Sequence, residues 1–257
     1  MKVVLFCGGL GMRMRDYSES IPKPMVPIGN RPILWHVMRY YAHFGHKDFI
    51  LCLGHRGETI KNFFLTYNEA LSNDFVLSEG GKRVDLLASD ISDWKITFVD
   101  TGLDANIGQR LKAVERYVKD EPMFLANYSD GLSDVSLPEQ LAHFQAEDKV
   151  ASFLCVRPNL TLHFVSLEPT GRVTAIRSAS QEDLRINGGF FIFRSEIFRY
   201  MKDGEELLLE PFHRLLEEGK LAAFRYDGFW MPMDTFKDRE HLDDMTRRGR
   251  APWTVWR

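Results

Sequence analysis

Three glycines and two arginines stand together in the segment GGLGMRMR, residues 8–15, directly after the apolar run KVVLFC. Glycine lets backbone N–H groups approach an anion closely, and arginine supplies a fork of donors, so the segment predicts a phosphate-binding loop. A dinucleotide fingerprint is disfavoured, because Met14 stands where the third glycine belongs. A Walker A loop is also disfavoured, because Gly-Lys-Ser/Thr is absent. A glycine-rich turn with solvated arginines is the simpler alternative.

A lysine, Lys23, stands between Pro22 and Pro24. The fixed φ angles of the two prolines restrict the backbone of the lysine and hence aim its side chain. An aimed lysine suits a triphosphate or a phosphate nucleophile. An exposed lysine in a stiff loop is an equally open interpretation of this motif taken alone.

Two aspartates, Asp130 in NYSDG and Asp234 in WMPMDT, each lie in a loop after an apolar or aromatic run. Magnesium prefers oxygen ligands and is usually held by one or two carboxylates together with phosphate oxygens and water. Two aspartates from distant parts of the chain can complete such a site. Their alternative roles are turn formation at Asp130, which precedes Gly131, and helix capping at Asp234.

Strands and helices are expected to alternate in the first half of the chain, which predicts right-handed βαβ units and a parallel sheet. In open α/β sheets, ligands bind beyond the carboxyl ends of the strands, so the site is expected in the loops after Cys7 and Asn127. The expected strands are residues 2–7, 48–53 and 122–127, and the expected helices are 32–45, about 56–67 and 108–119.

The order of predicted elements changes at about residue 150, where segments of strand composition follow one another with few helices between them. We expect these segments to add antiparallel strands that cover the site. Helices are expected to return at 208–218 and near 237–248. Earlier in the chain, residues 74–99 are expected to form extended pieces with a turn at Gly80 and Gly81.

Composition limits the choice of partners and compartment. With 257 residues and a formal net charge of -3, the chain has no basic field for a nucleic acid backbone, so nucleic acid is not an expected partner. Cys7, Cys52 and Cys155 stand in apolar runs and are expected to be buried thiols in a reducing compartment. The apolar run before Gly8 is too short for a signal peptide or a bilayer span. Because the thiols are expected to be reduced and no membrane segment is predicted, we expect a cytoplasmic protein without a membrane partner.

Five segments, taken in chain order, closely resemble the sugar-1-phosphate nucleotidyltransferases, and in particular the glucose-1-phosphate cytidylyltransferases, over nearly the whole chain. The resemblance implies a Rossmann-like α/β fold in one domain, with a mixed, mainly parallel central sheet flanked by helices. It places a nucleotide-binding half at about residues 1–150 and an acceptor-binding half at about 151–257. The segments are GGLGMRMR (8–15), PKPM (22–25), YSDG (128–131), INGGFF (186–191) and FWMPMDT (229–235).

The resemblance also implies a reaction and its participants: magnesium, CTP as cosubstrate, a phosphorylated small-molecule acceptor, and a homo-oligomeric enzyme. An acceptor phosphate oxygen attacks the α-phosphorus in line, so no protein nucleophile is needed. Each matching position then takes a role from the family. Gly8, Gly9 and Gly11 line the nucleotide site, Arg13 and Lys23 grip phosphates as catalytic residues, Arg110 assists at the triphosphate, Asp130 and Asp234 ligate magnesium beside the nucleotide, and Asn187 and Gly188 face the acceptor sugar.

The acceptor side departs from the family pattern. The family carries Glu-Lys-Pro, whose lysine holds the sugar phosphate, where residues 178–180 read Ser-Ala-Ser, and residues 163–166 replace an upstream glycine motif. Arg177 or Arg185 could reach the same phosphate. Three hypotheses follow: a cytidylyltransferase acting on glucose-1-phosphate, the same chemistry on a different phosphorylated acceptor, and a nucleotide-binding relative without turnover.

Overall fold

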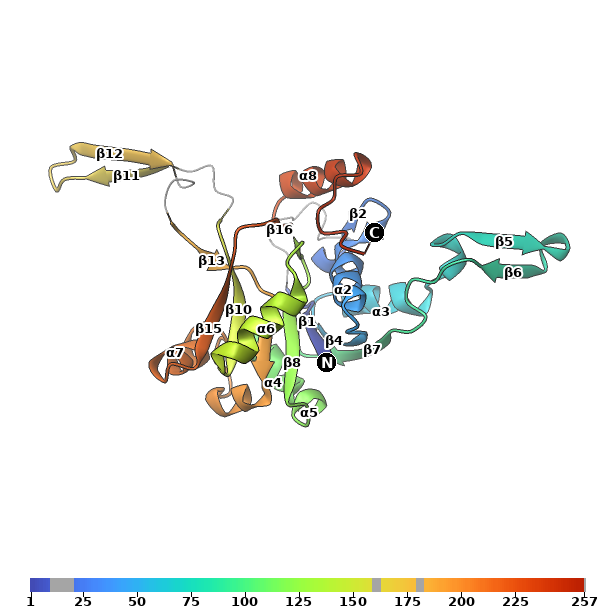
Figure 1. Ribbon diagram of the computed structural model, residues 1–257, viewed down its shortest axis with the longest axis horizontal. Coiled ribbons are helices and arrows are strands. Elements are labelled where there is room, and N and C mark those ends of the chain that lie inside the picture. Colours follow the sequence, from blue (N-terminus) through green and yellow to red (C-terminus); the bar gives the residue numbers. More distant parts are fainter. Residues whose placement is uncertain (10–20, 159–162, 179–182, 257) are drawn as a thin grey trace.

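A mixed sheet forms the centre of the computed structural model, which describes residues 1–9, 21–158, 163–178 and 183–256 (Figure 1). The strands of this sheet are β1 (Lys2–Phe6), β4 (Asp48–Leu53), β7 (Lys95–Asp100), β8 (Met123–Tyr128), β10 (Ala151–Val156), β13 (Ile186–Asn187), β14 (Phe191–Arg194) and β15 (Leu221–Tyr226). Within the described residues their order is β13-β10-β14-β8-β1-β4-β7, and β15 pairs with β10. The four strands β8, β1, β4 and β7 are parallel, whereas β14 runs antiparallel to β8.

Helices flank this sheet on both faces, which confirms the expected fold class. In strand β1, Val3 and Leu5 pack into the hydrophobic core on one side, while Val4 and Phe6 pack into the core on the other. A strand buried on both faces has to be apolar at every position, and this is why the parallel strands read as continuous apolar runs. The helices are α2 (Ile33–His43), α3 (Gly57–Leu65), α4 (Ile107–Ala113), α5 (Glu115–Val118), α6 (Leu137–Glu147), α7 (Glu210–Glu217) and α8 (Phe236–Arg247).

The helix boundaries follow their local signals, with one correction. Helix α2 starts after Pro32 and ends before Gly45, whose φ of +85° suits glycine. The single helix expected over 108–119 is instead two helices, α4 and α5. They separate at Val114, whose backbone leaves the helical region (φ -101°, ψ 3°) as its side chain enters the core. Helix α6, which Ser136 caps, was not predicted.

Smaller strand pairs and short 3-10 helices complete the described elements. The pair β9 (Gly131–Ser133) and β16 (Trp230–Pro232) stands at the carboxyl edge of the parallel strands. The remaining elements are the pairs β2 (Pro27–Ile28) with β3 (Arg31–Pro32), β5 (Phe75–Ser78) with β6 (Arg83–Leu86), and β11 (His163–Leu167) with β12 (Val173–Ser178), and the 3-10 helices η2 (Lys23–Met25), η3 (Glu69–Leu71), η4 (Glu79–Gly81) and η6 (Ser195–Tyr200).

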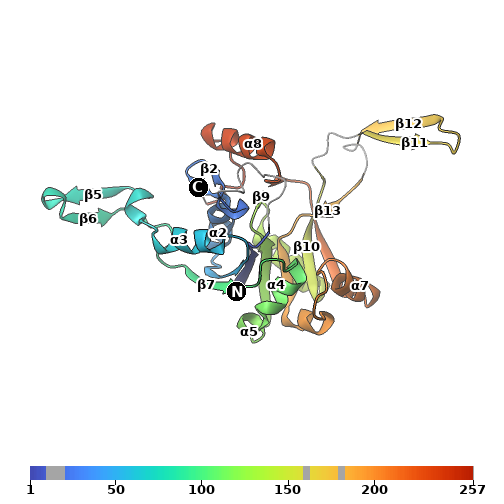
Figure 2. The same ribbon diagram turned by 180° about the vertical axis from the view of Figure 1, so that it is seen from behind.

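Two hairpins, β5–β6 and β11–β12, extend from opposite sides of the body in both views (Figures 1 and 2). The second differs from the expectation for the C-terminal half, because β11–β12 extends away from the body instead of covering the site. In β5–β6, Phe75 pairs with Leu86 and Leu77 with Val84, so all four apolar side chains share one face. Each of the four is 41–59% exposed.

The core joins the two halves of the chain. Trp253, near the C-terminus, is buried and donates its indole N–H to Nδ1 of His36 on α2 at 3.4 Å. None of the helices in the described ranges has both the length and the apolar character that crossing a membrane requires.

Candidate active site

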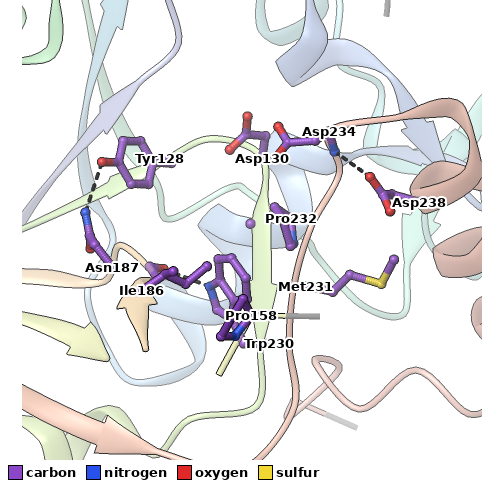
Figure 3. Close-up of a pocket in the computed structure, with 12 residues that line it drawn as sticks. Tyr128, Asp130, Pro158, Ile186, Asn187, Trp230, Met231, Pro232, Asp234 and Asp238 are labelled. Atoms are coloured by element: carbon purple, nitrogen blue, oxygen red, sulfur yellow. Dashed lines mark hydrogen bonds between the residues drawn. The ribbon is translucent and has the colours of Figure 1, made fainter. Parts of the chain in front are cut away.

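Three of the residues singled out from the sequence, Lys23, Asp130 and Asp234, meet beyond the carboxyl end of the parallel strands. Nζ of Lys23 lies 2.6 Å from Oδ2 of Asp130 and 2.7 Å from Oδ1 of Asp234. Figure 3 shows the two carboxyl groups side by side at the edge of a cavity. One ammonium group therefore neutralises part of the charge of two carboxylates that come from distant parts of the sequence.

Local structure positions each member of this cluster. Lys23 opens the 3-10 helix η2, and the turn is closed by the N–H of Met25, which donates to the carbonyl of Pro22 at 2.8 Å. Asp130 lies between β8 and β9. Asp234 lies between β16 and α8, a helix that Thr235 caps. The antiparallel pairing of β9 with β16 then brings the two aspartates together.

Electrostatics keep the ammonium of Lys23 charged. Burial lowers the pKa of this lysine, but the charge of Asp130 and the hydrogen bonds to both aspartates outweigh burial, so its pKa is raised above the usual value. The described residues contain no cluster of three or more histidine, cysteine or acidic side chains that could hold a metal. A pair of carboxylates fits magnesium, because this ion keeps most of its octahedral shell for phosphate oxygens and water.

Arg110 lies against Gly8 and is only 2% exposed. Its guanidinium donates to the carbonyls of Gly8 at 2.9 Å, Leu53 at 3.1 Å and Gly102 at 2.9 Å, residues that follow or end β1, β4 and β7. It also donates to Oγ1 of Thr101 at 2.7 Å. The arginine thus ties together the carboxyl ends of three parallel strands, and its donors reach backbone carbonyls and the hydroxyl of Thr101.

A side chain at Gly8 would displace this arginine. A Cβ atom on Gly8 would lie 2.0 Å from Nη1 of Arg110. Gly9, by contrast, is exposed, and a Cβ atom on it would meet none of the described residues within 4 Å. Gly11 and Arg13 lie outside the described residues.

A cavity of about 600 Å³ opens beside the aspartate pair. Asn187 and Gly188, the two residues that the resemblance assigned to the acceptor, are among its lining residues. Nδ2 of Asn187 donates to the hydroxyl of Tyr128 at 3.2 Å (Figure 3), while its Oδ1 accepts the N–H of Gly189 at 2.9 Å. The indole N–H of Trp230 donates to the carbonyl of Gly188 at 2.8 Å. The wall formed by β13 is therefore held from both sides.

The two arginines considered for the acceptor phosphate are absent from the described lining of this cavity. Arg177 is exposed on β12, in the hairpin that extends away from the body. Arg185 lies 2.6 Å from Asp227 and donates to the carbonyls of Cys155 and Tyr226. The structure thus places Arg185 as a link between β13, β10 and β15.

Three lining residues, Tyr128, Trp230 and Asp238, were missed as site residues in the sequence. Burial raises the pKa of Tyr128 to about 12, so its hydroxyl is neutral and can hydrogen-bond in the cavity. Tyr128 and Trp230 stood within the motifs YSDG and FWMPMDT, where only the aspartates were weighed. Asp238 gave a weaker signal, because its carboxylate also accepts the N–H of Thr235 in the cap of α8.

The comparisons with known proteins agree with this architecture. Residues 2–238 match the family described as nucleotidyl transferase, and the chain belongs to that family. It is 36% identical over 258 residues to the glucose-1-phosphate cytidylyltransferase of Salmonella typhi, with 100% of both chains covered. It is 23% identical over 266 residues to a mannose-1-phosphate guanyltransferase of Gibberella zeae, with 99% of this chain and 68% of that one covered. Within the family, the chain is a sugar-1-phosphate nucleotidyltransferase.

Solved structures support the fold. A UDP-glucose pyrophosphorylase complexed with UDP-glucose has a TM-score of 0.71 at 13% identity, covering 97% of this chain and 99% of that one. HddC from Yersinia pseudotuberculosis has a TM-score of 0.66 at 19% identity, covering 95% and 99%. At these identities the likeness concerns the α/β fold, and it agrees with the expected mainly parallel sheet.

Proposed function

We propose that the chain transfers CMP from CTP to glucose-1-phosphate with magnesium and releases pyrophosphate. The observation that carries this proposal is the convergence of Lys23, Asp130 and Asp234 at the carboxyl edge of the parallel sheet, beside a cavity. The choice of CTP and glucose-1-phosphate is supported by the full-length relative that is 36% identical.

Each site residue has its own role in an in-line displacement at the α-phosphorus. Asp130 and Asp234 would hold magnesium, which supplies neutralising charge for the α-phosphate and the pyrophosphate when bound. Lys23 positions phosphate oxygens, and Arg13 is proposed to hold the leaving pyrophosphate. The bond that forms joins an acceptor phosphate oxygen to the α-phosphorus, and the bond that breaks joins that phosphorus to the bridging oxygen of pyrophosphate. The acceptor phosphate is ionised at neutral pH and needs no general base.

The acceptor is assigned to the cavity lined by Asn187, Gly188 and Tyr128. A volume of about 600 Å³ is ample for a hexose phosphate, and the side-chain amide and phenol supply the polar contacts that a sugar requires. One observation favours a different phosphorylated acceptor: Arg185 is engaged by Asp227, and Arg177 lies on the extended hairpin. A second candidate function is therefore cytidylyl transfer to another phosphorylated small molecule.

A matrix of four nucleoside triphosphates against a panel of phosphorylated acceptors tests both candidates through pyrophosphate release. We expect the highest kcat/KM with CTP and glucose-1-phosphate. Stronger turnover of CTP with another acceptor would replace the first candidate with the second. If no pair turned over while nucleotide still bound, the chain would be a nucleotide-binding relative without catalysis.

We also propose that the protein is a homo-oligomer. A two-stranded hairpin is marginally stable in water by itself, and the β5–β6 hairpin exposes a face formed by Phe75, Leu77, Val84 and Leu86. The hairpin β11–β12 carries a similar face, on which Val165 pairs with Ile176 and Leu167 with Val173. Contact with other copies of the chain would remove both apolar faces from water, and their exposure in the single chain supports the proposal.

A further inference from the structure

One ammonium group, that of Lys23, occupies the space between the two carboxylates to which the proposed function assigns magnesium. Nζ lies 2.6 Å from Oδ2 of Asp130 and 2.7 Å from Oδ1 of Asp234. The distance between these two oxygens therefore cannot exceed the sum of the two contact distances. The side chain of the lysine is only 14% exposed. A positive charge therefore already stands where a second cation would have to enter.

The same electrostatic attraction cannot serve two cations at once. A metal ion that bound both carboxylates would have to replace the ammonium group. As long as the ammonium group stayed nearby, its positive charge would repel the metal ion. The backbone of Lys23 is fixed between Pro22 and Pro24, but the four methylene groups of the side chain let the ammonium leave without any backbone movement. A triphosphate beside the cluster offers this ammonium an alternative anionic partner.

We propose that Lys23 keeps divalent cations out of the Asp130–Asp234 pair until a triphosphate draws its ammonium away. This inference rests on the proposed function, which places both the metal and the triphosphate here. Nucleotide and metal then bind with positive coupling, and this coupling is reciprocal. In the free enzyme the carboxylate pair binds metal weakly, and the nucleotide arrives before the metal or together with it.

The test measures binding of Mn²⁺ alone to the full chain without nucleotide, by electron paramagnetic resonance of the free ion. Lys23→Met removes the ammonium, and we expect it to bind Mn²⁺ about tenfold or more tightly than the wild type. Lys23→Arg keeps the charge and should remain as weak as the wild type. Lys95→Met is the matched control, because it removes a surface lysine that pairs with Asp48 at 3.1 Å, and it should change nothing.

The double variant Lys23→Met with Asp234→Asn should not bind Mn²⁺ more tightly than the wild type. This result would show that the Mn²⁺ ion bound by Lys23→Met sits at the carboxylate pair. Lys23→Gln is a second neutral variant, and a rise in its Tm on adding Mn²⁺, absent in the wild type, provides an independent readout. Equal Mn²⁺ affinity in the wild type and both neutral variants would overturn the inference. If Asp234→Asn still weakened binding of Mn²⁺–CTP in that case, the metal site would stand. If it did not, the proposed metal site would fail as well.

Discussion

Gly131 lies opposite Pro232 in the β9–β16 pair, and the N–H of the next residue, Met233, donates to the carbonyl of Asp130 at 2.8 Å. This short antiparallel contact joins two loops from opposite halves of the chain. It explains how Asp130 and Asp234, which flank the paired strands, reach the same ammonium group. The metal assignment therefore depends on a backbone pairing as well as on two side chains.

Replacing Asp234 by alanine removes one of the two proposed magnesium ligands. We expect magnesium-dependent pyrophosphate release to fall by about a hundredfold or more, because several kcal/mol of charge stabilisation is lost. The fold should remain, since Thr235 and Asp238 cap α8 without this side chain. Asp244→Ala, on the surface of α8, is the matched control. Wild-type turnover in Asp234→Ala would refute the metal assignment.

Replacing Gly8 by alanine should displace the guanidinium of Arg110, because the new methyl group would lie 2.0 Å from Nη1. We expect a loss of about 1–3 kcal/mol in the free energy of unfolding, measured with urea. Gly9→Ala is the adjacent control, and its Cβ meets no atom of the described part of the chain within 4 Å. It should stay within about 0.5 kcal/mol of the wild type. Equal effects in the two variants would contradict the role given to Arg110.

Tyr128→Phe removes the hydroxyl that accepts a hydrogen bond from Nδ2 of Asn187. The KM for the acceptor should rise about fivefold while the KM for CTP stays constant, as loss of one neutral hydrogen bond implies. Because burial raises the pKa of Tyr128 to about 12, the hydroxyl stays protonated, and the effect should be flat over roughly pH 6 to 9. Tyr117→Phe, on α5, is the control. A change confined to the KM for CTP would remove Tyr128 from the acceptor wall.

Cys7 should resist alkylation in the folded protein. Burial raises the pKa of this thiol to about 12, so only about one molecule in ten thousand carries the reactive thiolate near pH 8. Iodoacetamide labelling followed by peptide mass spectrometry should modify Cys7 only after unfolding in urea. Cys155, which is half-buried, is the internal comparison. Equal labelling rates under native conditions would show that Cys7 is accessible to solvent.

Leu77→Glu places a charge on the apolar face of the β5–β6 hairpin. We expect it to dissociate the proposed oligomer toward the 29.8 kDa monomer in sedimentation velocity. Val76→Glu is the matched control, because Val76 pairs with Asp85 on the opposite face of the same hairpin. The control should sediment like the wild type. A wild type that is already monomeric, or identical behaviour of both variants, would contradict the assembly surface.

Much of the fold could be predicted because buried positions are occupied by apolar residues, whose spacing can be recognised in the sequence. The parallel strands are apolar at consecutive positions, and helix α2 has apolar spacing and a glycine at its end. The break at Val114 was not predictable, because the helical pattern continues through it and the core determines where the backbone turns. The direction of the β11–β12 hairpin likewise depends on packing, since the same alternation fits a strand in any orientation.

The site was predictable where its chemistry requires particular residue types. Lys23 and the two aspartates stood out for that reason, although only the β9–β16 pairing shows how they meet. Arg110 was a different case. An arginine in a helical pattern looks the same whether it faces solvent, a ligand or a carbonyl, and the contacts of Arg110 depend on the ends of three separate strands.

The pairing of β9 with β16 has a consequence for synthesis of the protein on the ribosome. The nascent chain holds Lys23 and Asp130 long before Asp234 emerges, and the contact between residues 131 and 232 joins positions that lie 101 residues apart. Such distant contacts form late, because chain entropy must be lost before they contribute. Emerging chains therefore lack one of the two proposed magnesium ligands until Asp234 has left the ribosome and β16 can pair with β9.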